Sequence, residues 1–424
     1  MIKKGIWVTI IFGISTLVQL ISQIVVTRLF GANLNLDIFL AAVALPTIIV
    51  TVIYGTLNEA FLPLYGEKRA KDAKNADSYF ATHILLLAFL SLIIALIMTF
   101  LSKPISTLLY GSRGGDFINA VSTQMSYMFY SIPLSVIATL FGTYFYVQKQ
   151  FIRFPFAQLI GSIVNVLLII SLYPLFGIWA LVIAFVINIL VQILFVVPHF
   201  TFSVNLKNSN LLPLLFVWIP LIIGSFALRS DTLLIRSFGA GLPEGYLVYL
   251  NLISKIFSLS AGVMTIGIQI VLLPHIVEYF SNKEHEKAIA TINKAKLVAL
   301  GVSLIVTICV ALIAPFVIQI LFVGNKFTQQ DANITTSLLP LFILPGIGWG
   351  INSIFFQPLL ALRKQLPLAI IEVLSLTLGW LVGLIFKNQF GILPGITAGL
   401  IVLLFSGVIG SELLWQYYKK RLTS

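Results

Sequence analysis

Long apolar runs dominate this chain and limit the folds open to it. Hydrophobic residues make up 59% of its 424 residues and charged residues only 9%, a balance foreign to water-soluble domains. A helix that spans a membrane needs about 20 mostly apolar residues, and the chain yields about twelve such runs. They are 5–30, 36–64, 80–102, 117–147, 154–175, 177–198, 210–236, 246–280, 294–323, 332–361, 366–386 and 390–417. We therefore predict an all-α polytopic membrane protein.

The first apolar run resembles a signal peptide in its basic tip only. It is too long for one, and no small-residue cleavage site follows it, so we expect it to be retained as the first helix. The one cysteine, Cys309, lies inside a later apolar run. Cysteine therefore builds neither a disulfide framework nor a metal site here, and we expect no metal and no cofactor.

Basic residues gather on one side of the predicted helices. They lie at both ends of the chain and after every even-numbered run, at Lys3, Lys4, Lys68, Arg69, Lys71, Lys74, Lys149, Arg153, Lys207, Lys283, Lys287, Lys294, Lys296, Arg363, Lys364, Lys419, Lys420 and Arg421. The opposite loops hold few, chiefly Lys103, Arg113, Lys326 and Lys387. The positive-inside rule then places both termini in the cytoplasm. The net charge of +12 reflects topology, and we expect no nucleic-acid partner.

Several short segments recur in the same order in the second half of the chain. "TRLFGA" matches "IRSFGA", "FLPLYGEKRAKDAKNA" matches "LLPHIVEYFSNKEHEKA", "ISTLLYGS" matches "IQILFVGN", and "YFYVQKQF" matches "LLALRKQL". The repeat predicts two bundles, 1–204 and 205–424, each with about six helices and the same orientation in the membrane. Such parallel repeats enclose a central cavity near the bilayer midplane and support alternating access. We expect the chain to act as a monomer.

Ionisable residues within predicted spans are costly and are functional candidates for that reason. Arg229 and Asp231 fall near the middle of the seventh span, but they point in different directions because they are two residues apart on a helix. Arg229 and Arg236 share a face, which favours cavity lining for Arg229, with a structural ion pair as the alternative. For Asp231 we favour the structural role. Lys255 in the eighth span either lines the cavity or snorkels to the surface.

Other charges lie nearer the ends of spans. Asp37 and Glu59 stand about 33 Å apart along one helix, which places Asp37 at the outer rim and Glu59 at the inner rim. For Glu59, Glu372 and Glu412 we favour a lysine partner or a polar rim over a proton or ion site.

Two short glycine-containing segments suggest turns or bends. Each "FGA" should end a helix, as a duplicated hinge between paired helices, and in the first copy Arg28 should pair with Asp37 across the turn. In the second copy Glu244 is the corresponding partner for Arg236. The segment "LPGIGWGIN" is dense enough in glycine and proline to predict a bend.

The segments "RLFGANLNLDIFLAAVALP", "EAFLPLYGE", "SLSAGVMTIGIQIVLLPHIVEYF", "ILFVGNKFTQQDA" and "LLALRKQLP" resemble the MviN/MurJ-type lipid II flippases of the multidrug/oligosaccharidyl-lipid/polysaccharide exporter superfamily. The likeness covers nearly the whole chain. It implies a cationic cavity that holds a lipid-linked saccharide by its pyrophosphate, with Lys255 and Asp37 at matching positions. The chain departs from the pattern at Thr16, Ser22, Val50, Thr51 and Tyr54, and we expect twelve spans where relatives commonly have fourteen.

These observations lead to one main hypothesis and two alternatives. The chain is expected to flip an undecaprenyl-pyrophosphate-linked saccharide, either lipid II or a surface polysaccharide unit, across a bacterial cell membrane. Its cavity residues would be Arg229, Lys255 and Arg236, and Arg28, Asp37, Glu59 and Asp231 would be structural or gating charges. A cation-coupled multidrug antiporter is the first alternative, and a scaffold without transport is the second. No Walker A, H-E-x-x-H or Ser/His/Asp pattern occurs, so we do not expect an enzyme.

Overall fold

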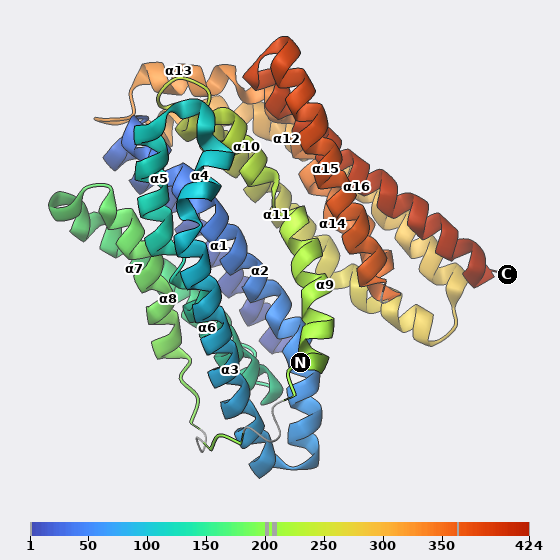
Figure 1. The fold of residues 1–424 in the computed structure, drawn as a ribbon. Coiled ribbons are helices and arrows are strands. Elements are labelled where there is room, and N and C mark those ends of the chain that lie inside the picture. Colours follow the sequence, from blue (N-terminus) through green and yellow to red (C-terminus); the bar gives the residue numbers. More distant parts are fainter. Residues whose placement is uncertain (1, 200–202, 206–209, 363, 424) are drawn as a thin grey trace. The chain divides into compact units, whose positions relative to one another are not determined.

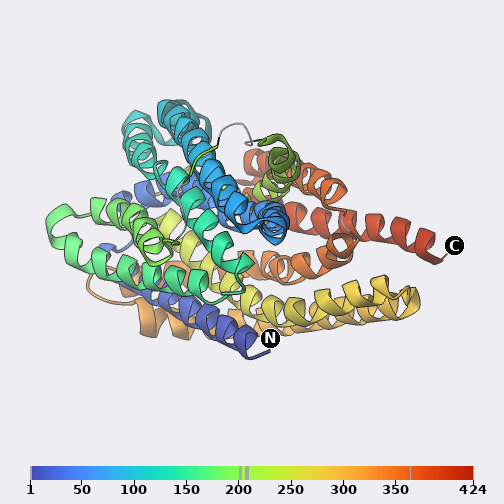
Figure 2. The ribbon, with the colours of Figure 1, turned by 90° about the horizontal axis from the view of Figure 1, so that it is seen from below.

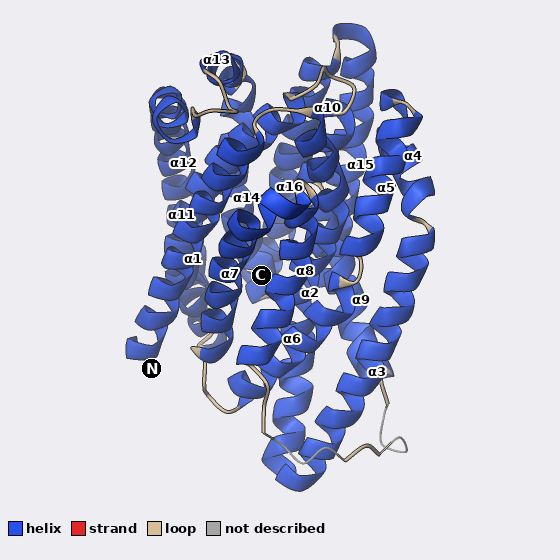
Figure 3. Ribbon diagram, turned by 90° about the vertical axis from the view of Figure 1, so that its left-hand side faces the viewer, coloured by secondary structure: helices blue, strands red, loops and turns tan. Residues whose placement is uncertain are grey.

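The computed structural model of this chain consists of helices joined by short connections (Figure 3). It describes residues 2–199, 203–205, 210–362 and 364–423, and their side chains except at 2–6, 9, 73–74, 263–271, 273–274, 281, 353 and 423. No strand occurs within these ranges. The predicted all-α fold is therefore confirmed.

Each predicted span is occupied by one helix or by two or three consecutive helical segments (Figure 1). In chain order these are α1 (Ile2–Phe30), α2 (Leu34–Lys71), α3 (Ala73–Phe100), α4 (Ser102–Tyr110), η1 (Gly111–Arg113), α5 (Gly115–Met128), α6 (Ser131–Val147), α7 (Arg153–Phe176), α8 (Trp179–Phe195), α9 (Leu212–Leu228), α10 (Asp231–Gly239), α11 (Tyr246–Ser281), α12 (His285–Phe322), α13 (Gln329–Ser337), η3 (Leu339–Phe342), α14 (Ile343–Ala361), α15 (Gln365–Phe390) and α16 (Ile392–Thr423).

The lengths of these helices suit a membrane. Within the described ranges, 9 helices are long and apolar enough to cross one, or 10 if the bent pair α9 and α10 forms a single span. Two further predicted runs coincide with α8, an apolar helix of 17 residues, and with α11, a helix of 36 residues. The prediction of a polytopic membrane protein is confirmed.

The chain divides into two compact units, Met1–Ile222 and Ile223–Ser424. The division falls within α9, whereas the sequence repeat predicts a boundary between residues 204 and 205. In the first unit α2 packs against α3, α5 and α6, while α7 packs against both α1 and α8. Because α2 is surrounded in this way, most of its apolar side chains are buried and it forms the centre of the unit.

In the second unit α14 packs against α11, α12 and α16, and α11 lies beside α12 (Figure 2). The helix continues through "LPGIGWGIN" without a break, and η3 lies just before it; the bend expected in this segment stays a prediction. The glycines serve close packing. An added Cβ would lie 2.7 Å from Phe257 at Gly346 and 2.8 Å from Leu404 at Gly348.

The most extensive helix pair joins α15 and α16 through glycines (Figure 1). Gly379 and Gly383 lie one turn apart on α15, and Gly395 and Gly399 lie one turn apart on α16. An added Cβ at any of the four would come within 3.0 Å of a neighbouring residue. Small residues at this spacing let two backbones approach closely, which favours helix association in a membrane.

The two "FGA" segments differ in structure. In the first, α1 ends at Phe30, and Gly31 takes φ 74° while its N–H donates to the Thr27 carbonyl at 2.9 Å. This left-handed conformation favours glycine and confirms the predicted helix end. In the second, α10 also ends within the motif, at Gly239, as predicted, and the missing Cβ there makes room for Leu250 at 2.8 Å. The second copy is therefore both a helix end and a packing contact.

Candidate functional site

The seventh predicted span is broken at the charged residues that sequence analysis selected. Helix α9 ends at Leu228 and α10 begins at Asp231, with a bend of 45° between them. At the break Arg229 and Ser230 lie between the two helices, and the Ser230 hydroxyl donates to the Phe226 carbonyl at 2.7 Å. Discontinuous helices at membrane depth expose backbone groups that bind ions and polar substrates.

Asp231 connects the break between α9 and α10 to neighbouring groups by hydrogen bonds. One carboxylate oxygen accepts a hydrogen bond from Trp349 Nε1 of α14 at 2.7 Å, and the other accepts from the Thr232 N–H at 2.7 Å. The carboxylate thus occupies the first turn of α10, where the helix dipole favours negative charge. These contacts are the ones expected of the structural role that we favour for Asp231.

Arg236 holds α10 against α11. Its side chain is buried, and its guanidinium donates to Asn251 Oδ1 at 3.0 Å. The sequence had suggested Glu244 as its partner, and that pairing stays a prediction. Because Arg236 is engaged with Asn251, it is less available to a substrate than the other cations of this region.

Arg229 and Lys255 differ from Arg236 because both side chains are exposed. Within the described part of the chain, neither makes an ion pair within 4.0 Å. The Lys255 ammonium interacts electrostatically with Arg236 and Asp231, and the Arg229 guanidinium interacts with Asp231. These four residues therefore form one charge cluster, in which three cations face a single carboxylate. Its excess positive charge suits an anionic group.

The charges of the first unit serve other contacts. Asp37 is completely buried at the start of α2 and pairs with Arg113 of η1 at 3.3 Å. Sequence analysis noted Arg113 only as an outer-loop cation and named Arg28 as the partner of Asp37, a pairing that stays a prediction. Arg28 and Glu59 are exposed, and Glu59 does not belong to the charge cluster.

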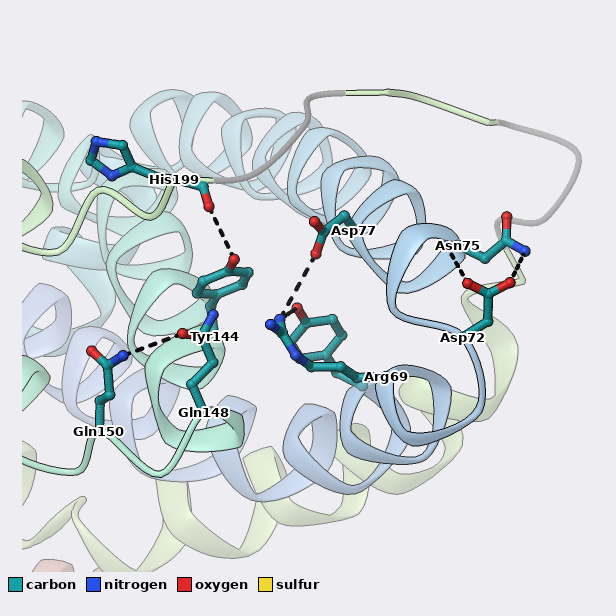
Figure 4. A network of polar contacts seen from close by, with 9 residues as sticks. Arg69, Asp72, Asn75, Asp77, Tyr144, Gln148, Gln150 and His199 are labelled. Carbon is teal, nitrogen blue, oxygen red and sulfur yellow. Dashed lines mark hydrogen bonds and ion pairs between the residues drawn. The ribbon is translucent and has the colours of Figure 1, made fainter.

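The first unit contains, where α2 meets α3 and α6, a polar network that sequence analysis missed (Figure 4). Arg69 of α2 donates to the Tyr65 hydroxyl at 2.8 Å, lies 3.8 Å from the Asp77 carboxylate of α3, and covers the Tyr144 ring of α6 at 5.2 Å. The Tyr144 hydroxyl donates to the His199 carbonyl at 3.1 Å. We had interpreted Arg69 as a topological signal, but it also joins three helices.

The first unit also contains an apolar pocket of about 580 Å³. Its lining includes Tyr127, Tyr130, Phe176 and Trp179, with aliphatic side chains of α8. No charged residue lines it. The pocket therefore offers no counter-charge to an anion, and the charge cluster is the better candidate for a head-group site.

Comparisons with known proteins point to one family. The family model described as "Lipid II flippase MurJ" matches residues 26–424. A relative from Borreliella burgdorferi, "Probable lipid II flippase MurJ", is 24% identical over 407 residues, which cover 92% of this chain and 79% of the relative.

Solved structures share the fold. A structure titled "Lipid II flippase MurJ, inward closed conformation" matches with a TM-score of 0.82 and 18% identity, covering 98% of this chain and 87% of that one. An inward-facing multidrug resistance MATE family transporter of the MOP superfamily matches with a TM-score of 0.73 and 19% identity, covering 96% and 95% of the two chains. At these identities the structures inform the fold alone.

Proposed function

Because the chain belongs to the lipid II flippase MurJ family, we propose that it moves lipid II, or a related undecaprenyl-pyrophosphate-linked saccharide, from the cytoplasmic to the outer face of a bacterial cell membrane. One observation supports an anionic cargo: Arg229 and Lys255 are exposed cations. No described carboxylate lies within 4.0 Å of either one to form an ion pair. Intramembrane charge of this kind is expensive and is kept for a ligand.

The charge cluster suits a pyrophosphate. A guanidinium and an ammonium hold phosphate oxygens by charge-assisted hydrogen bonds, which are strongest away from bulk water. The first turn of α10 closely follows Arg229 in the chain. Asp231 and Arg236 position this turn through Trp349 and Asn251. The cargo crosses chemically unchanged, so the site needs to bind and release and performs no catalysis.

We propose alternating access as the transport mechanism, with the charge cluster holding the head group in both states. The bend of 45° between α9 and α10 supports this mechanism because a broken span allows its two segments to move separately. We further propose that both termini face the cytoplasm, as the distribution of lysine and arginine favours, and that a single chain is the transporting unit.

A cation-coupled multidrug antiporter is the second candidate, because a MATE family transporter shares the fold. The sign of the intramembrane charge distinguishes the two functions. A site for cationic drugs requires acidic residues, whereas the only carboxylate of the charge cluster, Asp231, is already hydrogen-bonded to Trp349 and Thr232. The cluster therefore favours the anionic cargo.

The decisive experiment is complementation of a strain depleted of its lipid II flippase. Wild type should restore growth, and Arg229→Ala and Lys255→Ala should each reduce flipping by about 10- to 100-fold, the value of a lost charge-assisted hydrogen bond. Lys103→Ala is the matched control, since Lys103 is an exposed lysine outside the charge cluster, and it should behave like wild type.

Two outcomes would change the proposal. If both alanine variants complement as well as wild type, the charge cluster does not bind the cargo. If wild type fails to complement but restores a missing surface polysaccharide, the cargo is that polysaccharide unit.

A further inference from the structure

The apolar pocket of the first unit has no part in the proposed transport site. It lies where the span made of α5 and α6 is interrupted and where α7 turns into α8. Helix α8 packs against both α6 and α7 (Figure 1). All of the lining belongs to this one unit, so the pocket can be considered without reference to the second unit.

The sequence accounts for both interruptions. Helix α5 ends at Met128 and α6 begins at Ser131. Pro133 follows in the first turn of α6, where it has no N–H and its ring crowds the carbonyl four residues earlier, so one continuous helix is disfavoured. On the other side of the pocket Gly177 takes φ 53° and ends α7, a conformation that favours glycine. The pocket is therefore bordered by two helix ends that the local sequence specifies.

The pocket lies near one surface of the membrane. Phe176, which lines it, is the last residue of α7, a helix long and apolar enough to span the membrane. The Tyr127 and Trp179 rings pack edge to face with centroids 5.5 Å apart, and they remain 55% and 36% exposed. Tyrosine and tryptophan favour the level where acyl chains meet head groups, because each ring is apolar and has a polar tip.

Three polar tips at this pocket make no side-chain hydrogen bond within the described part of the chain. They are the hydroxyls of Tyr127 and Tyr130 and the indole N–H of Trp179. The described lining contains no charged residue. A ligand that suits both features has an apolar chain with uncharged hydrogen-bond acceptors at one end, as the ester groups of a glycerolipid provide.

The volume of the pocket selects the chain. A methylene group is similar in size to water, which takes about 30 Å³ in the liquid, so a pocket of about 580 Å³ accepts roughly 20 carbon atoms. One acyl chain of a phospholipid fits this space, whereas a whole undecaprenyl chain is too long. Exposed apolar residues of α7 next to the pocket, such as Leu175 and Ile170, require a cover of membrane lipid. The pocket is continuous with that lipid-facing surface.

We propose that the apolar pocket binds one acyl chain of a membrane glycerophospholipid, whose ester oxygens accept hydrogen bonds from the tyrosine hydroxyls and the indole N–H. The bound lipid connects the interruption between α5 and α6 to the turn between α7 and α8, and so stabilises the first unit. It is a resident ligand, separate from the charge cluster and from the transported cargo. This lipid site goes beyond the proposed flippase function and does not depend on it.

The test labels the site directly. The purified full chain in detergent micelles receives rising amounts of phosphatidylglycerol with a photoactivatable diazirine in one acyl chain, and peptide mass spectrometry locates the label after illumination. Label should concentrate on residues 127–130 and 176–187 and reach a plateau at one lipid per chain. Lipid that exchanges freely over the apolar surface should label in proportion to its concentration, without a plateau.

Variants make the assignment specific. Ile183→Trp places a large ring in the pocket lining and should reduce labelling there by about 10-fold or more, because each methylene excluded from an apolar site weakens binding by about fourfold. Tyr127→Phe is the milder change. It removes one donor, keeps the ring, and should weaken labelling by about 5-fold. Ile170→Trp is the matched control, since Ile170 is exposed on α7 outside the pocket lining, and it should label like wild type.

Three results would overturn the lipid site. One is labelling of wild type that spreads along α7 without a plateau. Another is an Ile183→Trp variant whose pocket is labelled like that of wild type. The third is displacement of the labelled phospholipid by an equal concentration of undecaprenyl phosphate, which would assign the pocket to the cargo's chain. None of these measurements requires transport, so they are independent of the flippase proposal.

Discussion

Three acidic residues, Asp37, Asp231 and Glu372, lie in three different environments. Asp37 has the Arg113 cation at 3.3 Å, Asp231 accepts hydrogen bonds from Trp349 and Thr232, and Glu372 has neither an ion pair nor a hydrogen bond within the described structure. A buried charge is tolerated when it is paired and is costly when it is not. The first two environments therefore suit structural roles, whereas Glu372 lacks such a partner within the described structure.

The Asp37–Arg113 pair permits a residue-level test. Arg113→Ala should destabilise the protein by about 3 kcal/mol, because it leaves a fully buried carboxylate without this cation. The double variant Asp37→Asn with Arg113→Ala should be less damaging than Arg113→Ala alone, because the uncompensated charge is gone. Thermal unfolding midpoints in detergent measure both. Equal midpoints for the single and double variants would show that the pair contributes no coupling.

At the level of helices, a glycine-rich helix interface and a broken span organise the second unit. Glycines of α15 and α16 permit close packing along a continuous interface, while the break between α9 and α10 contains none and is held by Ser230 and Asp231. A rigid helix pair and a broken span thus occur in the same unit. This combination gives a firm support beside a segment that is able to rearrange.

The helix interface predicts the effect of adding side-chain volume. Gly383→Val should lower stability by about 1–3 kcal/mol, the usual effect of overpacking, because even its Cβ would lie 2.7 Å from the Phe238 ring and 3.1 Å from the Gly395 carbonyl. Gly301→Val on α12 is the control, because no atom lies within 4 Å of its added Cβ. The denaturation midpoint should fall for the first variant only. Similar losses in both would indicate a general intolerance of valine.

At the scale of the whole molecule, topology is open to direct measurement. Because Cys309 is the one cysteine, Cys309→Ser provides a background for single-cysteine labelling. In that background Ser112→Cys should react with a membrane-impermeant maleimide in intact cells, whereas Lys149→Cys should react only after the cells are opened. The opposite pattern would place both termini outside and would reverse the direction assigned to transport.

The sequence by itself determined the location of the helices, the class of protein and the residues worth testing. Apolar run length and the burial cost of charge act locally, so they can be evaluated without knowing which helices touch. That reasoning located Arg229, Asp231 and Lys255, which belong to one charge cluster in the structure.

Only the tertiary structure decided which partner each charge has. Arg113 meets Asp37 from 76 residues away in sequence, and Trp349 meets Asp231 from 118 residues away. Such contacts depend on how whole helices pack, and no local pattern encodes them. The same packing left Glu372 against Gly224 without the lysine expected from sequence. Local hydrophobicity therefore specifies the helices, whereas long-range packing specifies the environment that gives each charge its role.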